Sequence, residues 1–232
     1  MSTHFPPCDL PGWPQTCIYW AKHPKNVAII FVHGFGGHAV GAWKHFSDML
    51  VKSRMCDGVD ITFYGYNSTK VRADLSASRL HDFLTQLCLN FEDVMLNSFL
   101  SLASRPNNFA YNKIIMAAHS LGGALCRKVV LECYRSNSPE VRVPELVLFA
   151  PAHKGADVLS LLQTTLSPFF LPALVKIFAH RLYPVLHDLD PSSPFLLQLE
   201  AETKARIHSL SGKNGASMTG LVAKRVMVAL RM

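Results

Sequence analysis

The sequence predicts an α/β domain in which helices cover both faces of a mostly parallel sheet. Predicted strands alternate with predicted helices along the 232 residues, which is the element order of parallel α/β sheets. The segments 26–34, 114–119 and 145–150 are continuously apolar, as strands buried on both faces are. Because 49% of the residues are hydrophobic and no linker or repeat interrupts them, we expect one domain over residues 1–232.

Each predicted element follows from its local pattern. Runs of apolar, β-branched and aromatic residues indicate strands, whereas apolar residues at helical spacing indicate helices. In chain order we expect strands at 17–21 and 26–34, a helix at 39–54, a strand at 59–66, a helical segment with a break at 73–103, a strand at 114–119, a helix after Ser120, and a strand at 145–150.

Polar and glycine-rich loops follow these predicted strands. They read HGFGGH at 33–38, HSLGG at 119–123 and PAHKGA at 151–156. Ligands of open α/β sheets bind beyond the carboxyl ends of the strands, where such loops meet. The sequence therefore predicts a functional site at this edge.

Ser120 is the strongest candidate for a nucleophile. It stands between an apolar strand and a helical pattern, and the residues two before and two after it, Ala118 and Gly122, are small enough for a tight turn. A serine at this place can also be a simple helix N-cap. As a nucleophile it would use the backbone N–H of Leu121 to stabilise an oxyanion, and the N–H of Phe35 in the HGFGG turn would be a second donor.

With these motifs, the chain resembles the α/β-hydrolase family and its lipase- and esterase-like members. The resemblance extends over about residues 17–202 and includes the loops at 33–37, 118–123 and 151–155 and the segment DLDPSSPFLLQL at 188–199. It implies a serine hydrolase of carboxylic esters that forms an acyl-enzyme on Ser120.

The catalytic acid and histidine of this family are missing from their usual place. The family order is nucleophile, acid, histidine, and the acid would end a late strand, here 206–212. However, no Asp or Glu follows Glu202, and no histidine follows His208. The remaining candidates for the base are His208, paired with Asp157, Asp188 or Asp190, and His153.

Two further interpretations stay open beside the active ester hydrolase. The chain can be a shortened form that lacks the triad acid and histidine. It can also be a catalytically silent binding or interaction protein that keeps the hydrolase fold.

The segment 157–187 is expected to form an apolar cap over the site. Its residues 158–175 carry no charge, and prolines at 168 and 172 argue against a membrane span. Such a cap suits lipid or other hydrophobic acyl substrates, because it excludes water from the oxyanion contacts.

Composition limits the partners and the cellular location. A net charge of +7 without a dense basic run favours peripheral contact with an anionic membrane over nucleic-acid binding. No metal-ligand spacing or phosphate loop is present, so we expect no cofactor and no metal. Scattered cysteines and the absence of a secretory signal predict a cytoplasmic protein, and the oligomeric state is left open.

Overall fold

The computed structural model describes residues 3–89, 105, 109–136, 138–152 and 183–213. Its elements in chain order are β1 (Cys8–Leu10), β2 (Trp13–Tyr19), β3 (Val27–Val32), the 3-10 turn η1 (Gly41–Trp43), α1 (Phe46–Lys52), η2 (Arg54–Cys56), β4 (Val59–Tyr64), α2 (Ala73–Leu89), β5 (Lys113–His119), α4 (Leu121–Ser136), β6 (Glu145–Phe149), α7 (Val185–Asp188) and α8 (Pro194–Lys213).

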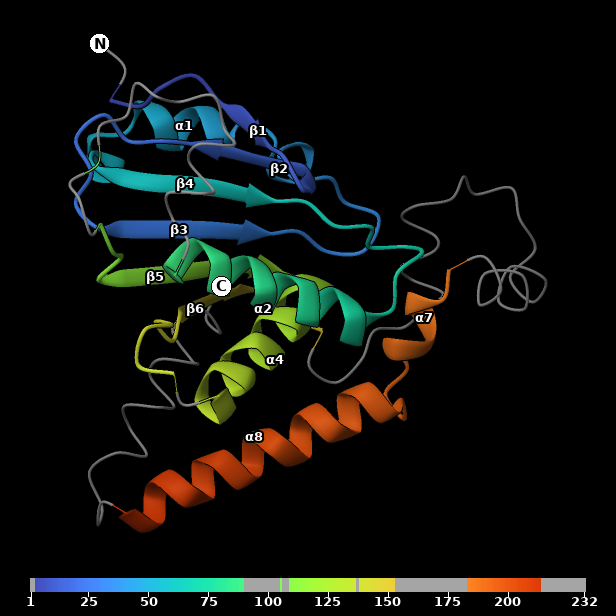
Figure 1. The fold of residues 1–232 in the computed structure, drawn as a ribbon. Coiled ribbons are helices and arrows are strands. Elements are labelled where there is room, and N and C mark those ends of the chain that lie inside the picture. The colour runs from blue at the N-terminus through green and yellow to red at the C-terminus, as the bar shows by residue number, and fades with distance from the viewer. Residues whose placement is uncertain (1–2, 90–104, 106–108, 137, 153–182, 214–232) are drawn as a thin grey trace, which may run out of the picture.

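The strands form one six-stranded sheet in the order β1-β2-β4-β3-β5-β6 (Figure 1). The four strands from β4 to β6 pair in parallel, whereas β1 and β2 add an antiparallel edge. In this register Val32 pairs with both Tyr64 and Ala118, and Ala118 pairs with Leu148. The carboxyl ends of the parallel strands therefore lie level, and the loops that follow them open at one edge, which confirms the predicted mostly parallel sheet.

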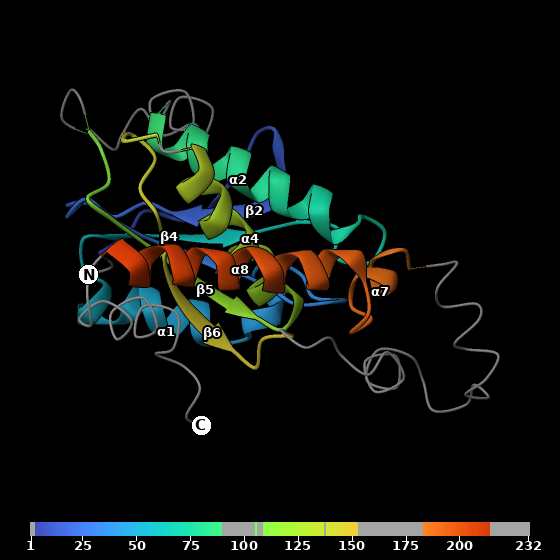
Figure 2. The same cartoon turned by 90° about the horizontal axis from the view of Figure 1, so that it is seen from below.

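Helices cover both faces of this sheet. Helices α2 and α4 lie on one face and α1 lies on the other (Figure 2). Strand β3 serves both layers, because its side chains alternate. Ala28, Ile30 and Val32 join the larger core under α2 and α4, while Phe31 belongs to the smaller core with Ile61.

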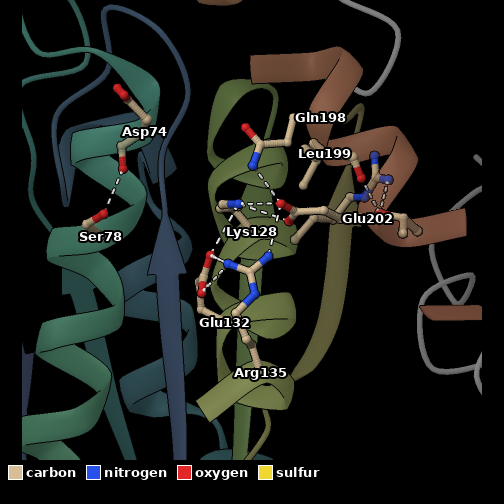
Figure 3. A network of polar contacts seen from close by, with 10 residues as sticks. Asp74, Ser78, Lys128, Glu132, Arg135, Gln198, Leu199 and Glu202 are labelled. Atoms are coloured by element: carbon tan, nitrogen blue, oxygen red, sulfur yellow. Dashed lines mark hydrogen bonds and ion pairs between the residues drawn. The ribbon is translucent and has the colours of Figure 1, made fainter. Parts of the chain in front are cut away.

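Helix α8 packs on α4 (Figure 1). The Glu202 carboxylate accepts hydrogen bonds from Lys128 at 2.9 Å and Gln198 at 2.7 Å, and it forms an ion pair with Arg135 at 3.0 Å (Figure 3). One turn later the Arg206 guanidinium stacks over the Tyr134 ring at 4.3 Å. These contacts place residues 202–206 beside the C-terminal half of α4.

Two predicted elements were wrong. Residues 206–212 were expected to form a strand. They belong to α8 instead, the helix that packs on α4. The single helix expected at 39–54 is divided into η1, α1 and η2. Lys44 has φ 49° and ψ −125°, which interrupts it before α1, and Ser53 is extended, which ends α1.

The other predicted elements form close to their expected positions. At the antiparallel edge of the sheet, only residues 17–21 were expected to form a strand. The structure has two strands there, β1 and β2. The expected helical segment 73–103 begins as α2, and the break expected within it lies outside the described residues. Among the helices of the described ranges, none is both long and apolar enough to cross a membrane.

Candidate active site

Ser120 occupies the turn between β5 and α4 in a left-handed conformation, with φ 52°. A residue with a side chain keeps such a conformation only where its surroundings hold it there. The Ser120 N–H donates to the Phe149 carbonyl oxygen at 3.1 Å. Its own carbonyl oxygen accepts from the N–H groups of Gly123 at 2.9 Å and Ala152 at 3.2 Å. The strained turn is thus fixed by the end of β6 and by the first turn of α4.

The loop after β3 packs directly against this turn. A Cβ atom added to Gly122 would lie 2.5 Å from the carbonyl oxygens of Val32 and His33, and one added to Gly34 would lie 2.9 Å from the Ser120 Cβ. Only glycine allows the backbones to approach so closely. A Cβ on Gly123 would likewise lie 2.8 Å from the Pro151 Cβ. The loop after β3, the Ser120 turn and residues 151–152 after β6 therefore meet at this edge.

Polar contacts fix the shape of the loop that carries Phe35. The Gly34 carbonyl oxygen accepts from the His33 ring at Nδ1, at 2.8 Å, and from the Gly37 N–H at 3.2 Å. The Tyr66 hydroxyl donates to the His33 carbonyl oxygen at 2.8 Å, and its ring stacks on the His33 ring with centroids 4.3 Å apart. Burial of the His33 ring lowers its pKa to about 4, so the ring is neutral at pH 7.

Comparison with known proteins identifies the family to which this fold belongs. No curated protein matches the chain significantly, whereas the model of the alpha/beta hydrolase family matches residues 29–225, which are most of the chain. The chain belongs to the alpha/beta hydrolase family.

Solved structures similar to this alpha/beta hydrolase are esterases and lipases. The thermostable carboxylesterase EstE1 from a metagenomic library is 17% identical, with a TM-score of 0.50 over 81% of this chain and 58% of its own. The mature lipase BlEst2 from Bacillus licheniformis is 18% identical, with a TM-score of 0.49 over 78% and 62%. Carboxyl esterase 2 from Tuber melanosporum is 21% identical, with a TM-score of 0.47 over 84% and 62%. The chain spans about three fifths of each protein, and at 17% identity the likeness to EstE1 shows the fold alone.

Three of the residues that the sequence patterns predicted for the chemistry, Ser120, Leu121 and Phe35, lie near one another. Leu121 begins α4, where a backbone N–H has no partner inside the helix, and it directly follows Ser120. Phe35 lies in the loop that contacts Ser120 through Gly34, and its half-buried ring packs edge-on against Tyr183 with centroids 5.8 Å apart.

The structure does not bring His208 to Ser120. His208 is exposed on α8 of the hydrolase, two residues after Arg206, which stacks on Tyr134. Because a helix rises 1.5 Å per residue, Tyr134 lies about 20 Å along α4 from Ser120. His153, the other candidate for the base, lies outside the described residues.

The acids considered as partners for His208 have other roles where they are described. Asp188 is buried and accepts hydrogen bonds from the Arg72 side chain at 2.6 Å and the Ala73 N–H at 2.7 Å, so it joins α7 to the start of α2. Burial raises the Asp188 pKa, while these two donors act against that rise. Asp190 accepts from the Ser192 N–H at 2.8 Å, and Asp157 lies outside the described residues.

The sequence patterns missed Tyr66 and Tyr183 as members of this site. Tyr66 closely follows β4, so its place after a third parallel strand could have indicated it. Tyr183 reaches Phe35 only through the tertiary fold, and no local pattern marks it. Within the described ranges, no group of three or more His, Cys, Asp or Glu side chains could hold a metal ion.

Proposed function

We propose that the protein is a serine hydrolase of carboxylic esters that forms an acyl-enzyme on Ser120. The conformation of Ser120 carries this proposal: a left-handed residue between a buried strand and a helix, packed against glycines of two loops. That geometry exposes a serine hydroxyl beside backbone N–H groups at the carboxyl edge of the sheet. Membership of the alpha/beta hydrolase family supports it.

The Ser120 hydroxyl would attack the ester carbonyl carbon, and the carbonyl oxygen would take up negative charge. The N–H groups of Leu121 and Phe35 would donate to this oxyanion, and the positive end of the α4 dipole lies at the same place. Collapse of the tetrahedral intermediate would release the alcohol, and water would then hydrolyse the acyl-enzyme.

This reaction requires a base that takes the Ser120 proton and then gives it to the leaving alcohol. We propose His153 for this role, since it directly follows Ala152, whose N–H binds the Ser120 carbonyl oxygen. The exposed position of His208 on α8 gives it no such connection.

Labelling with a fluorophosphonate probe tests the proposal. The folded chain should be labelled, whereas Ser120→Ala and heat-denatured protein should not. A folded chain that resists the probe would favour the second candidate, a catalytically silent binding protein.

The substrates that we propose are lipids or other esters with hydrophobic acyl chains. Tyr183 belongs to the described part of the expected cap segment. Its ring packs against Phe35 beside the Ser120 turn, so aromatic side chains border the proposed oxyanion site. Hydrolysis of p-nitrophenyl esters should become faster from acetate to octanoate. Equal or falling rates along this series would contradict an apolar substrate site.

We further propose that the protein is cytoplasmic and touches anionic membranes through the surface of residues 44–55. Phe46, Met49 and Met55 are 37%, 65% and 92% exposed there, and the cations Lys44, Lys52 and Arg54 flank them. This mixture of apolar and basic side chains suits an anionic lipid surface. The six cysteines are all free thiols, which suits a reducing compartment.

Sedimentation with vesicles tests this membrane contact. The chain should bind phosphatidylserine vesicles, bind phosphatidylcholine vesicles less, and lose binding as salt is raised. Replacing Met49 and Met55 by Glu should remove binding. Leu197→Glu is the matched control, since Leu197 is 54% exposed on α8. Equal loss in both variants would contradict the assigned surface.

A further inference from the structure

The orientation of one peptide group decides whether Phe35 can serve as an oxyanion donor. The bond between Gly34 and Phe35 is trans, so the Gly34 carbonyl oxygen and the Phe35 N–H point in opposite directions. The oxygen is held on one side by the His33 ring at Nδ1, at 2.8 Å, and by the Gly37 N–H at 3.2 Å. The Phe35 N–H therefore faces away from the His33 ring.

A flip of this peptide would reverse which of its two polar groups faces the oxyanion position. A flip changes ψ of Gly34, which glycine tolerates, and it moves φ of Phe35 into the positive range, which a residue with a side chain disfavours. A flipped peptide would turn the Gly34 carbonyl oxygen to the side where the N–H now points, and that oxygen would repel an oxyanion instead of stabilising it. The two hydrogen bonds to the Gly34 carbonyl oxygen add to this resistance and hold the peptide in its present orientation.

The His33 ring is built to make one of these hydrogen bonds. It is fully buried and stacks on the Tyr66 ring with centroids 4.3 Å apart, while the Tyr66 hydroxyl donates to the His33 carbonyl oxygen at 2.8 Å. A carbonyl oxygen can only accept, so Nδ1 of the His33 ring must carry the proton. Nε2 is buried without a hydrogen-bond partner among the described residues, which suits a neutral ring.

We propose that His33 is a positioning residue that holds the Gly34–Phe35 peptide with its N–H toward the oxyanion position, and that Tyr66 holds His33 in place. This inference rests on the proposed function, because it gives the Phe35 N–H a role in the reaction at Ser120. It adds two side chains that act through the backbone and contact no reacting atom.

Three variants separate positioning from structural support. His33→Asn keeps an N–H donor near the place of Nδ1, His33→Leu removes the donor from a side chain of similar size, and Tyr66→Phe keeps the stacked ring without its hydroxyl. Loss of one oxyanion donor slows such enzymes about 10²–10³-fold. We expect His33→Leu to slow fluorophosphonate labelling by this factor, and His33→Asn to restore it to within about tenfold of the wild type. Tyr66→Phe should lie between them.

The kinetics of p-nitrophenyl butyrate hydrolysis give a second readout. An interaction made only in the transition state affects kcat and leaves KM nearly unchanged. His33→Leu should therefore lower kcat alone. A folded His33→Leu variant with wild-type labelling and kcat would overturn the inference, and so would a His33→Asn variant as slow as His33→Leu.

Nuclear magnetic resonance tests the same contact without activity. Long-range proton–nitrogen spectra should show the Nδ1–H form of His33, and amide exchange of Phe35 should change in His33→Leu and return in His33→Asn. If wild-type Ser120 fails to react with the probe, the proposed function fails, and these spectra still decide the positioning role. An Nε2–H form, or a Phe35 amide that is unchanged in His33→Leu, would overturn it.

Discussion

At the scale of single residues, the Ser120 turn depends on the absence of a side chain at Gly122. A methyl group there would lie 2.5 Å from two carbonyl oxygens at the end of β3, and backbone atoms cannot give way as a flexible side chain can. We expect Gly122→Ala to lower the free energy of unfolding by about 1–3 kcal/mol or more, as overpacking does. Gly41→Ala is the matched control, because its nearest atom would lie 3.8 Å away. Urea denaturation measures both variants, and equal midpoints would contradict the close approach.

The buried His33 ring makes stability depend on pH in a defined direction. Burial lowers its pKa to about 4 in the folded chain, from 6.5, so the unfolded chain binds a proton first as the pH falls. The stability that depends on this neutral ring is complete above about pH 7 and is lost as the pH falls toward 4, by about 2.5 kcal/mol at pH 4.5. Urea midpoints at pH 7 and pH 4.5 should therefore fall further for the wild type than for His33→Asn. An identical fall in both proteins would show that His33 titrates normally.

At the scale of elements, sequence patterns identified the parallel strands and the helix after Ser120, because their apolar periods match the layers that bury them. They failed at 206–212. A strand was expected there from the element order of the resembled family. Ile207 and Leu210 instead stand three residues apart, as in a helix, and tertiary contacts such as Arg206 with Tyr134 hold that helix. The helix expected at 39–54 failed for a different reason, since the left-handed Lys44 interrupts an otherwise regular pattern.

Docking of α8 on α4 should depend on Glu202. Its carboxylate meets Lys128, Arg135 and Gln198, and its side chain is only 18% exposed. Glu202→Ala removes these bonds and brings two cations together, so we expect a loss of about 1–2 kcal/mol in the free energy of unfolding. Lys204→Ala is the control, because the Lys204 side chain is 74% exposed and its pair with Glu200 should contribute less than about 0.5 kcal/mol. If thermal and urea unfolding show equal effects for both, the network does not anchor α8.

At the scale of the whole molecule, the site is assembled from loops that are far apart in sequence and level in the sheet. Parallel register explains why sequence patterns alone could place Ser120, Leu121 and Phe35 together, because Val32 pairs with Ala118 shortly before the two loops begin. No such rule locates the base, because its position depends on how segments after β6 return to this edge. His208 satisfied the chain order of the family and nevertheless lies exposed on α8.

The choice between the two histidines is therefore a prediction about the whole fold. His208→Ala should leave fluorophosphonate labelling within about twofold of the wild type, because exposed surface substitutions away from a site have small effects. His153→Ala should reduce labelling by orders of magnitude, since the serine of such a triad is inert without its base. Leu197→Ala, another exposed change on α8, provides the control for damage to that helix. Loss of labelling in His208→Ala alone would require α8 to pack elsewhere than on the C-terminal half of α4. Full labelling of both histidine variants would mean that a different group takes the Ser120 proton.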